Sequence, residues 1–350
     1  MKAGSVEKGK SIVAGFDIGG AHLKVTRAEN GRIVEALTIA TPLWISLHKL
    51  TEAFREAAPL HARADLNAFT MTGELSDIFP SRDAGVSTLL EQISENFPSG
   101  KNLIYAGRSG FVEVEKARRQ STDVASANWH ATAALVAKLT GDALFVDMGS
   151  TTTDLTPIRN GVITSEGYTD AERLMSGELV YTGFTRTFLF GVASSAPVGG
   201  RLTPLMNEYF ASIADVHRIM GVLDEKDDKH PSADGKEKTA AGSTARLARM
   251  VGRDAADLEP AEWRNVASWF SEQQLRKMHD AAFLGARFLS DDAPIVGAGI
   301  GRWQIKRLAE RMERRFVDFA DIIPANDAAR SEAGSAAPAA AVALLATCQL

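Results

Sequence analysis

The sequence is poor in cysteine and has no apolar run long enough to cross a membrane. Cys348 is the single cysteine among 350 residues, which excludes an internal disulfide and a cysteine-based metal cluster. Chains without disulfides are typical of reducing compartments, so we expect a cytoplasmic protein. The apolar stretch 11–16, although lysines precede it, is too short for a signal peptide. The alanine-rich stretch 336–350 contains Pro338 and is also too short to span a membrane, so we interpret it as a closing helix packed on a sheet.

Positive charge is not concentrated anywhere in the chain. The net charge is -5, the isoelectric point is about 5.9, and basic residues are interspersed with acidic ones. Proteins that bind nucleic acid usually carry a basic patch or stripe, so we expect no nucleic-acid partner. With 45% hydrophobic residues, a chain of 350 residues is long enough for two cores of ordinary domain size.

What the sequence does contain is an internal repeat. Asp-x-Gly-[Gly/Ser], followed thirteen residues later by Asn-Gly, occurs at 17–31 and again at 147–161, an offset of 130 residues. Each copy begins with an apolar run, turns at glycine and turns again at Asn-Gly, which is typical of three antiparallel strands. The repeat indicates a duplication, so we expect one half over 1–141 and the other over 142–350.

The residues of the repeat suit an oligophosphate. Glycine after a buried strand lets backbone N–H groups approach phosphate oxygens, and an aspartate at the strand end can hold a divalent cation. We predict that the two turns clamp one phosphate chain, with Mg²⁺ held by Asp17, Asp147 or Asp154. The alternative is that the glycines only make hairpin turns. The predicted phosphate-binding residues are Gly19, Gly20, Gly149, Ser150, Thr151, Thr152 and Thr153.

The same offset of 130 residues relates Lys24 to Asp154. A lysine in one copy and an aspartate in the other would supply one cation for the phosphate and one carboxylate for Mg²⁺ or a proton. We therefore predict a catalytic role for both. The alternative is that the two side chains form only an ion pair between the halves.

The elements that follow each repeat have the same order. In the first half, helices are predicted at 46–57, 86–96 and 126–139, and strands at 68–72 and 102–106. In the second half, helices are predicted at 272–289, at 302–314 and over the alanine-rich stretch, and strands at 294–297 and 316–321. Both halves therefore have the order βββαβαβα, and the second carries an insertion at about 167–270.

This order and the two turns resemble the actin, sugar kinase and Hsp70 superfamily over nearly the whole chain. The resemblance implies an α/β protein with a duplicated ribonuclease-H-like fold and a phosphate-binding cleft between two lobes. The adenosine-binding turn of that superfamily is matched by 294–301, with Gly297, Gly299 and Gly301, so ATP is a possible ligand. A dinucleotide motif fits less well, because the spacing is G-x-G-x-G and no first strand precedes it. The alternative is a plain turn at a helix start.

Within the superfamily, 147–154 resembles the hydantoinase and oxoprolinase group, with a Ser/Thr run that ends in aspartate. The segments 71–79, 127–131, 177–183 and 246–254 resemble a subgroup linked to tetrahydromethanopterin-dependent one-carbon transfer. That subgroup is similar to the enzyme of methanofuran biosynthesis that condenses a furan with tyramine. The resemblance implies a transferase that joins an aminomethylfuran-methyl diphosphate to the phenol oxygen of a tyramine or tyrosine-like unit and releases diphosphate.

Acidic residues follow the predicted strand at 68–72, where a catalytic base is expected. Glu74 or Asp77 would accept the proton of the phenol. The alternative is that both lie at a helix N-terminus, where acids favour the helix dipole.

Specificity is expected in the insertion, because arginine forks match phosphate and carboxylate oxygens. The candidate substrate contacts are His22 in the first turn and Tyr181, Thr182, Arg186, Arg246 and Arg249 in the insertion. Alternatively Arg246 and Arg249, three apart on a helix, bridge acidic side chains. The charged run 224–238 is predicted to be a mobile loop, and His130 and His217 are predicted to be structural.

Three function classes follow from these observations. The first is the diphosphate-displacing transferase, which needs Mg²⁺ and does not require ATP. The second is an ATP-dependent small-molecule kinase or a hydantoinase- or oxoprolinase-type hydrolase, and the third is a nucleotide-binding regulator or assembly factor.

Overall fold

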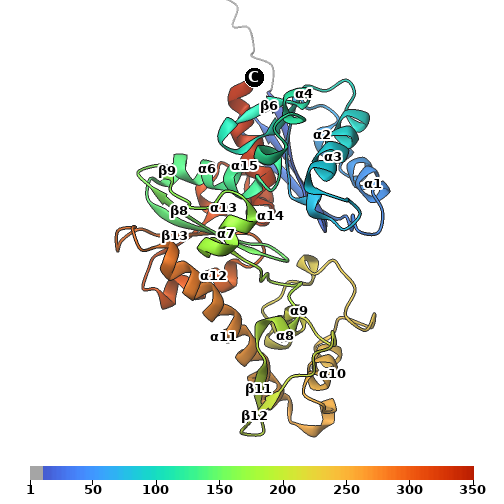
Figure 1. Cartoon of the computed structure of the whole chain (residues 1–350), viewed down its shortest axis with the longest axis vertical. Coiled ribbons are helices and arrows are strands. Elements are labelled where there is room, and N and C mark those ends of the chain that lie inside the picture. Colours follow the sequence, from blue (N-terminus) through green and yellow to red (C-terminus); the bar gives the residue numbers. More distant parts are fainter. Residues whose placement is uncertain (1–10) are drawn as a thin grey trace, which may run out of the picture. The chain divides into compact units, whose positions relative to one another are not determined.

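The computed structural model describes residues 11–350, and the chain divides into two compact units (Figure 1). The first unit contains the chain up to Leu139 together with Phe319–Leu350, and the second contains Thr140–Asp318. The lysine-containing segment 1–10 lies outside the described residues. The C-terminal stretch therefore belongs to the first unit, whereas the sequence placed it with the second half.

The first unit is built on a sheet with the strand order β3-β2-β1-β4-β5-β6. Its strands are β1 (Ile12–Ile18), β2 (His22–Glu29), β3 (Arg32–Ala40), β4 (Leu66–Met71), β5 (Asn102–Tyr105) and β6 (Phe111–Glu113). The first three strands pair antiparallel, whereas β4 and β5 run parallel to β1. The helices of the first 140 residues are α1 (His48–Glu56), α2 (Ala58–His61), α3 (Arg82–Asn96), α4 (Val114–Ala117), α5 (Ser121–Val124) and α6 (Asn128–Thr140).

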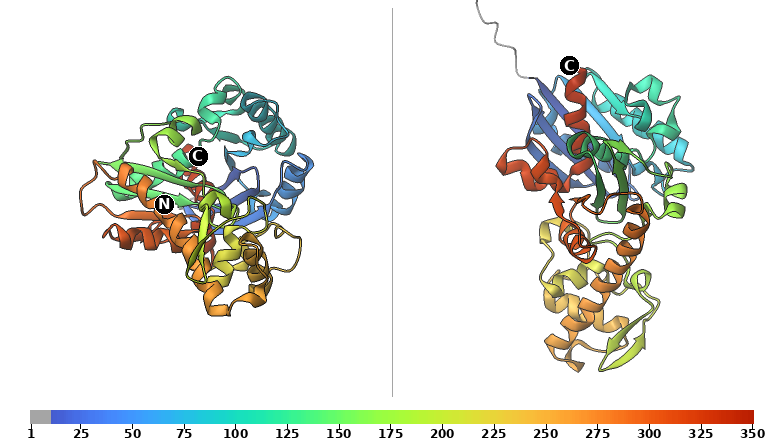
Figure 2. Two further views of the ribbon diagram at one scale, coloured as in Figure 1. Left: turned by 60° about the horizontal axis from the view of Figure 1, so that its bottom comes forward. Right: turned by 90° about the vertical axis from the view of Figure 1, so that its left-hand side faces the viewer.

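The C-terminal helices complete the first unit. They are α13 (Phe319–Ile322), α14 (Asp327–Ser335) and α15 (Ala337–Ala346). The alanine-rich α15 lies against β1, and in Figure 2 it is the red helix beside the blue strands. A Cβ atom on Gly15 of β1 would lie 2.2 Å from the carbonyl oxygen of Ala339. The small residues of both elements allow this close approach, which explains why the closing helix packs on this sheet.

The second unit repeats the same topology. Its sheet has the order β10-β8-β7-β13-β14, and β9 also pairs with β8. The strands are β7 (Ala143–Met148), β8 (Thr153–Arg159), β9 (Val162–Ile163), β10 (Leu179–Val180), β13 (Ile295–Ala298) and β14 (Phe316–Asp318). The Asn-Gly turns are nearly identical, with φ of 50° and 73° at Asn30 and Gly31 and 52° and 73° at Asn160 and Gly161. The shared strand order and turn geometry confirm the predicted duplication.

An insertion with its own hydrophobic core extends the second unit. Its elements are α7 (Asp170–Ser176), α8 (Leu189–Val192), β11 (Ser195–Val198), β12 (Arg201–Pro204), α9 (Ile213–Met220) and α10 (Ala240–Met250). The core includes Leu247, Trp263 and Phe270. Helix α11 (Pro260–Gly285) begins at Pro260 rather than near 272, because Glu259 and Glu262 form a capping box before it. The long helix therefore connects the insertion core to the sheet, which α12 (Arg302–Arg311) also covers.

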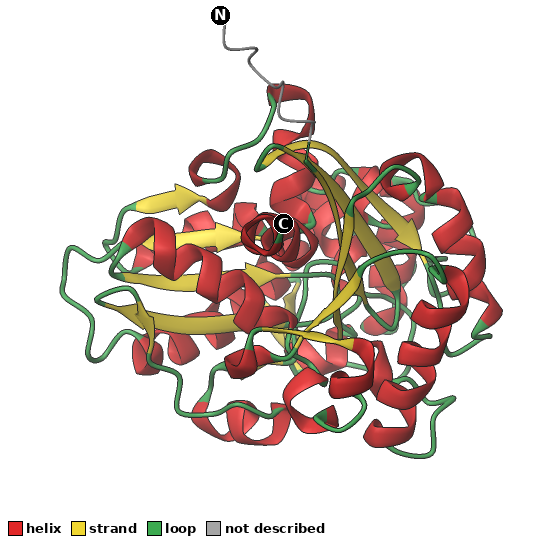
Figure 3. Ribbon diagram, turned by 90° about the horizontal axis from the view of Figure 1, so that it is seen from above, coloured by secondary structure: helices red, strands yellow, loops and turns green. Residues whose placement is uncertain are grey.

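Helices accompany the strands of both units (Figure 3). Within residues 11–350, none of these helices combines the length and the apolar character that crossing a membrane requires.

Candidate functional site

In the first unit, the predicted phosphate turn joins β1 to β2. The backbone N–H of Gly19 donates to the carbonyl of His22 at 2.9 Å and closes the hairpin. Asp17 and Lys24 face each other across the strand pair, with Lys24 Nζ 3.2 Å from Asp17 Oδ2. Burial raises the pKa of Asp17, and the charge of Lys24 opposes that shift. The turn thus holds an ion pair directly beside its backbone N–H groups, and the half-buried His22 begins β2.

The second turn, between β7 and β8, has the same backbone and different charges. Gly149 N–H donates to the carbonyl of Thr152 at 3.0 Å. Asp147 and Asp154 occupy the positions of the aspartate and lysine of the first turn and are direct cross-strand neighbours. Arg173 of α7, which is 1% exposed, donates from Nη1 to Asp154 Oδ1 at 2.6 Å. Each of the two positions that the sequence analysis paired thus has an ion-pair partner within its own unit.

The segment 182–187 packs directly on the second turn. Phe184 N–H donates to the carbonyl of Gly149 at 2.9 Å. A Cβ atom on Gly183 would lie 2.3 Å from the carbonyl carbon of Ser150, so this position accepts no larger residue without movement of the backbone. The conformation of the second phosphate turn therefore depends on a segment that begins the insertion.

Arg186 brings a cation to this turn. Its backbone N–H donates to the carbonyl of Ser150 at 2.8 Å, and its Nη1 lies 3.4 Å from the hydroxyl oxygen of Thr151. Burial lowers the pKa of Arg186, whereas Tyr181 and Tyr209 raise it. The guanidinium stays charged at neutral pH, so a cation lies beside the hydroxyl of Thr151 in this turn.

Two predicted contact residues have buried partners instead. The hydroxyl of Thr153 donates to the carbonyl of Thr182 at 2.7 Å, and the hydroxyl of Thr182 accepts from Gln274 Nε2 at 2.9 Å. Both threonines are buried, whereas Tyr181 is 69% exposed. The hydrogen bonds of the two threonines hold the buried side of the second turn. Of these three residues, only Tyr181 has a mainly exposed side chain.

The predicted structural histidines have the expected surroundings. His217 is fully buried, stacks on Phe184 with ring centroids 4.1 Å apart, and its Nδ1 lies 2.9 Å from the carbonyl oxygen of Phe184. The pKa of His217 is lowered to about 4, because burial lowers it more than the hydrogen bond to Phe184 raises it, and the charge of Arg307 adds to the lowering. His130 Nδ1 lies 2.9 Å from the hydroxyl of Tyr105. His217 therefore supports the segment that braces the second turn.

The adenosine-type turn lies against the same strand end. Ala298 is in register with Asp147, and Gly301 N–H donates to the carbonyl of Met148 at 3.0 Å. Gly299 has φ of +84°, and a Cβ atom there would lie 2.3 Å from the carbonyl oxygen of Met148. Packing against β7 thus requires these glycines whether or not a nucleotide binds, so their presence does not by itself indicate an ATP site.

The oxygen donors of the two turns fit Mg²⁺. Asp17 Oδ1 is buried and has no hydrogen-bond partner among the described residues, and Asp147 and Asp154 are adjacent on neighbouring strands. Across residues 11–350 no group of three acidic, histidine or cysteine side chains forms a metal cage. Mg²⁺ is usually held by one or two carboxylates together with phosphate and water, and each turn offers that number within its own unit, Asp17 in the first and Asp147 with Asp154 in the second.

The two candidate bases differ in environment. Glu74 lies in a short 3-10 turn (Gly73–Leu75) after β4, is 1% exposed, and accepts a hydrogen bond from the hydroxyl of Ser126 at 2.8 Å. Asp77 is exposed. Helix α3 begins later, with Ser81 as its N-cap, so neither acid lies in its first turn. Glu74 does lie in the first turn of the three-residue 3-10 helix, so the helix-end alternative fails only for Asp77.

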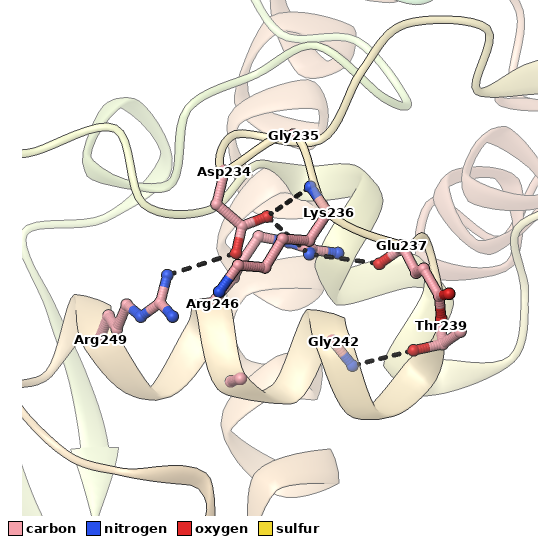
Figure 4. A pocket seen from close by; sticks show the side chains of 9 residues that line it. Asp234, Gly235, Lys236, Glu237, Thr239, Gly242, Arg246 and Arg249 are labelled. Carbon is pink, nitrogen blue, oxygen red and sulfur yellow. Dashed lines mark hydrogen bonds and ion pairs between the residues drawn. The ribbon is translucent and has the colours of Figure 1, made fainter.

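The insertion arginines contact acidic side chains. Arg246 is fully buried and donates from Nε to Asp215 at 2.9 Å. Its Nη1 donates to one oxygen of Asp234 at 3.1 Å, and Arg249 donates to the other oxygen at 3.3 Å (Figure 4). These contacts match the alternative in which both arginines bridge acids. Arg246 and Arg249 line an open pocket of about 520 Å³. Through Asp234 they also hold the loop 224–238, which the sequence predicted to be mobile.

Some residues of the site were missed by the sequence analysis. Arg173 gave no signal, because its contact with Asp154 joins residues that are 19 positions apart. Phe188 and Tyr209 were also missed, although Phe188 follows Arg186 by two positions in a segment that was already singled out. The rings of Phe188 and Tyr209 lie 4.4 Å apart and are both partly exposed.

Comparison with known proteins places this arrangement in a family. Residues 65–343 match the model of the hydantoinase/oxoprolinase family. A (4-{4-[2-(gamma-L-glutamylamino)ethyl]phenoxymethyl}furan-2-yl)methanamine synthase of Methanocaldococcus jannaschii is 30% identical over 97% of this chain and 99% of its own length. A protein of the same name from Methanococcus vannielii is 34% identical over 126 residues, which are 36% of this chain and 56% of that protein.

Among solved structures, the nucleotide-free structure of an acetone carboxylase has a TM-score of 0.54 and 11% identity, over 93% of this chain and 70% of that one. This likeness confirms the fold that the repeat predicted. The family model and the near full-length relative together show that the chain belongs to the hydantoinase/oxoprolinase family.

Proposed function

We propose that this chain is a transferase that joins a furylmethyl diphosphate to a phenol and releases diphosphate, in the biosynthesis of a methanofuran- or methylofuran-type carrier. Such a carrier would support tetrahydromethanopterin-linked one-carbon transfer. The observation that carries the proposal is the 30% identity over 97% of the chain to a synthase whose name describes a furan joined to a phenol oxygen through a methylene group. The enzyme would act in the cytoplasm on small-molecule substrates.

The proposed reaction forms one carbon–oxygen bond and breaks another. The phenol oxygen attacks the methylene carbon of the furan, the bond from that carbon to the diphosphate oxygen breaks, and the phenol proton passes to a base. Negative charge develops on the departing diphosphate. Lys24, Arg186 and the backbone N–H groups of the glycine turns are suited to stabilise it where it develops.

We propose Glu74 as the base in preference to Asp77. A buried carboxyl group is shielded from water, and the hydroxyl of Ser126 orients it at 2.8 Å. A base that is held in one geometry transfers a proton more effectively than an exposed, mobile one. Asp77 is exposed beyond the end of β4.

Mg²⁺ is the cofactor that we propose, held by Asp17 and Asp147 with a contribution from Asp154. Its charge would neutralise the diphosphate group that these turns bind. ATP is not required in this mechanism. The adenosine-type turn favours an ATP-dependent kinase or ring hydrolase as the second candidate, because it lies against the end of β7 beside the second phosphate turn.

One experiment separates these candidates. Purified protein is incubated with aminomethylfuran-methyl diphosphate, Mg²⁺ and tyramine, γ-glutamyltyramine or tyrosine, with and without ATP. We expect diphosphate release without ATP and an ether product of the matching mass. Strict dependence on ATP hydrolysis, with no diphosphate released from the furan, would instead support the kinase or hydrolase class. Nucleotide binding without turnover of any substrate would support a regulator.

A further inference from the structure

Three aromatic side chains of the insertion form an exposed cluster, which we call the aromatic face: Phe188, Phe190 and Tyr209. The ring of Phe188 lies 4.4 Å from that of Tyr209 and 5.6 Å from that of Phe190. Their exposed fractions are 44%, 37% and 43%. Rings that contact one another and still remain open to solvent provide a surface on which a further ring can stack.

The backbone around the aromatic face is fixed. Phe188 forms an isolated antiparallel bridge with Ser212, and Ile213 N–H donates to the carbonyl of Thr187 at 2.8 Å. These contacts join the start of α8 to the start of α9, which lie close together in Figure 1. Phe188 and Tyr209 come from different segments, so their contact is a property of the folded insertion and not of one flexible loop.

The aromatic face is linked to the second phosphate turn through Arg186, whose backbone N–H donates to the carbonyl of Ser150. Arg186 precedes Phe188 by two residues, and its Nη1 lies 3.4 Å from the hydroxyl oxygen of Thr151. The ring of Tyr209 lies 4.4 Å from that of Phe188, so Tyr209 adjoins the segment that carries Arg186. A cation, a hydroxyl of the phosphate turn and an aromatic surface are thus adjacent within one unit.

Further positive charge lies nearby. His230 is half-buried, and its pKa is lowered to about 4 by burial and then by the charges of Arg186 and Lys238. Two permanent cations therefore lie close to one neutral imidazole. Lys238 Nζ is itself paired with Asp228 Oδ2 at 3.4 Å.

We propose that Phe188 and Tyr209 are the docking face for the furan ring of the diphosphate substrate, with Arg186 holding the diphosphate to which that ring is attached. This inference rests on the proposed function. In a furylmethyl diphosphate one carbon separates the ring from the anion, which matches an aromatic surface that begins beside an anion-binding turn. Inorganic diphosphate has no ring and would contact only the turn. The aromatic face would therefore make the enzyme bind an aryl-methyl diphosphate more tightly than inorganic diphosphate.

Isothermal titration calorimetry on the full chain tests this inference with two probes in the presence of Mg²⁺. One probe is inorganic diphosphate. The other is benzyl phosphonophosphate, in which the benzyl carbon is bonded directly to phosphorus, so the probe has no carbon–oxygen ester bond that can break. We expect the parent protein to bind the benzyl probe roughly tenfold more tightly, which is the effect of about one stacked ring.

The variants separate the ring from the anion. Phe188→Ala and Tyr209→Leu should each lose most of the preference for the benzyl probe and keep the affinity for inorganic diphosphate. Arg186→Gln should weaken the binding of both probes. Phe283→Ala is the matched control, because Phe283 is a 66% exposed phenylalanine on α11 that contacts His279. It should change neither affinity.

Each contrary outcome identifies what is wrong. If the parent binds diphosphate but gains nothing from the benzyl group, or if Phe188→Ala and Tyr209→Leu both keep the preference, the docking face is wrong and the proposed function stands. If the parent binds neither probe, the proposed function and the inference are both wrong. Thermal unfolding reports whether each variant is folded, and if Phe188→Ala is unfolded it is replaced by Phe188→Leu, which removes the ring, keeps an apolar side chain and should also lose the preference.

Discussion

The first and second glycine turns have the same backbone and different surroundings. In both, the first glycine donates to the carbonyl three residues later, at 2.9 Å in the first turn and 3.0 Å in the second. The aspartate that precedes this glycine also has the same cross-strand register in both. The register partner, however, is Lys24 in the first turn and Asp154 in the second. Duplication therefore preserved the hairpin, while the charges beside it diverged.

Support for the two turns differs as well. The second turn is braced by 182–187, and Arg173 neutralises its extra carboxylate, whereas the first turn neutralises Asp17 through its own β2. The first turn is thus a self-contained hairpin with a cation, and the second depends on the insertion. Because the insertion also carries the aromatic face, the surface that we propose for the furan ring and the segment that packs on the second turn belong to the same part of the chain. The predictions below test this difference.

The largest expected effect comes from the charge that distinguishes the first turn. Lys24→Ala should lower the rate of diphosphate release roughly 100- to 1000-fold, because a cation beside the departing group acts mainly in the transition state. Thermal stability should fall much less, since the raised pKa of Asp17 lets the unpaired carboxyl take up a proton. Turnover and melting temperature are measured together, with Lys24→Arg as the charge-preserving control. A variant that loses stability and keeps full turnover would show that Lys24 serves only as an ion-pair partner.

The next largest effect, on stability, comes from the segment 182–187 that packs on the second turn. Gly183→Ala should lower the free energy of unfolding by about 3 kcal/mol, because its Cβ atom would lie 2.3 Å from Ser150 and Thr151 backbone atoms. Gly149→Ala is the matched control, since the nearest atom to its Cβ would be 3.9 Å away, and should cost about 0.5 kcal/mol. Urea unfolding measures both. Equal losses would mean that the segment 182–187 does not constrain the turn.

Low pH should lower the free energy of unfolding through His217, which packs on Phe184 of the segment 182–187. The pKa of His217 is about 4 in the folded chain, below the ordinary value of 6.5, because burial disfavours the charged ring. The unfolded chain therefore binds more protons between these two values, so this contribution to stability is present above pH 6.5 and is lost as the pH falls toward 4. From pH 7 to pH 5 the loss should be about 2 kcal/mol. In His217→Gln, which retains a donor for Phe184 and does not titrate, this part of the pH dependence should be absent.

Local motifs made the duplication readable from the sequence. Asp-x-Gly and Asn-Gly specify turns through their own backbone requirements, so both hairpins and most of the later strands were predicted close to their observed positions. The start of α11 was predicted too late, although Glu259, Pro260 and Glu262 carry a readable capping signal.

Contacts between distant segments were not readable. The sequence does not indicate which sheet the alanine-rich helix covers, because that depends on the fit between Gly15 and Ala339. Nor did it show that Arg246 is enclosed by Asp215 and Asp234, since an arginine on a helix has the same pattern whether it binds substrate or an acid. Residue type predicted the two glycine hairpins, whereas the partners of each side chain are seen only in the folded chain.

The smallest expected effect concerns what the two turns still share. Asp17→Asn and Asp147→Asn should each weaken Mg²⁺-dependent binding of diphosphate roughly tenfold, because each removes one charged oxygen ligand and leaves the backbone N–H groups in place. Titration of diphosphate at several Mg²⁺ concentrations measures this, with the exposed Glu56→Gln as the control. Similar losses in both variants would show that the carboxylate function was retained in both copies while position 24 and position 154 diverged. If both variants bind diphosphate and ATP like the parent, neither aspartate supports the metal, and the resemblance between the turns is one of backbone alone.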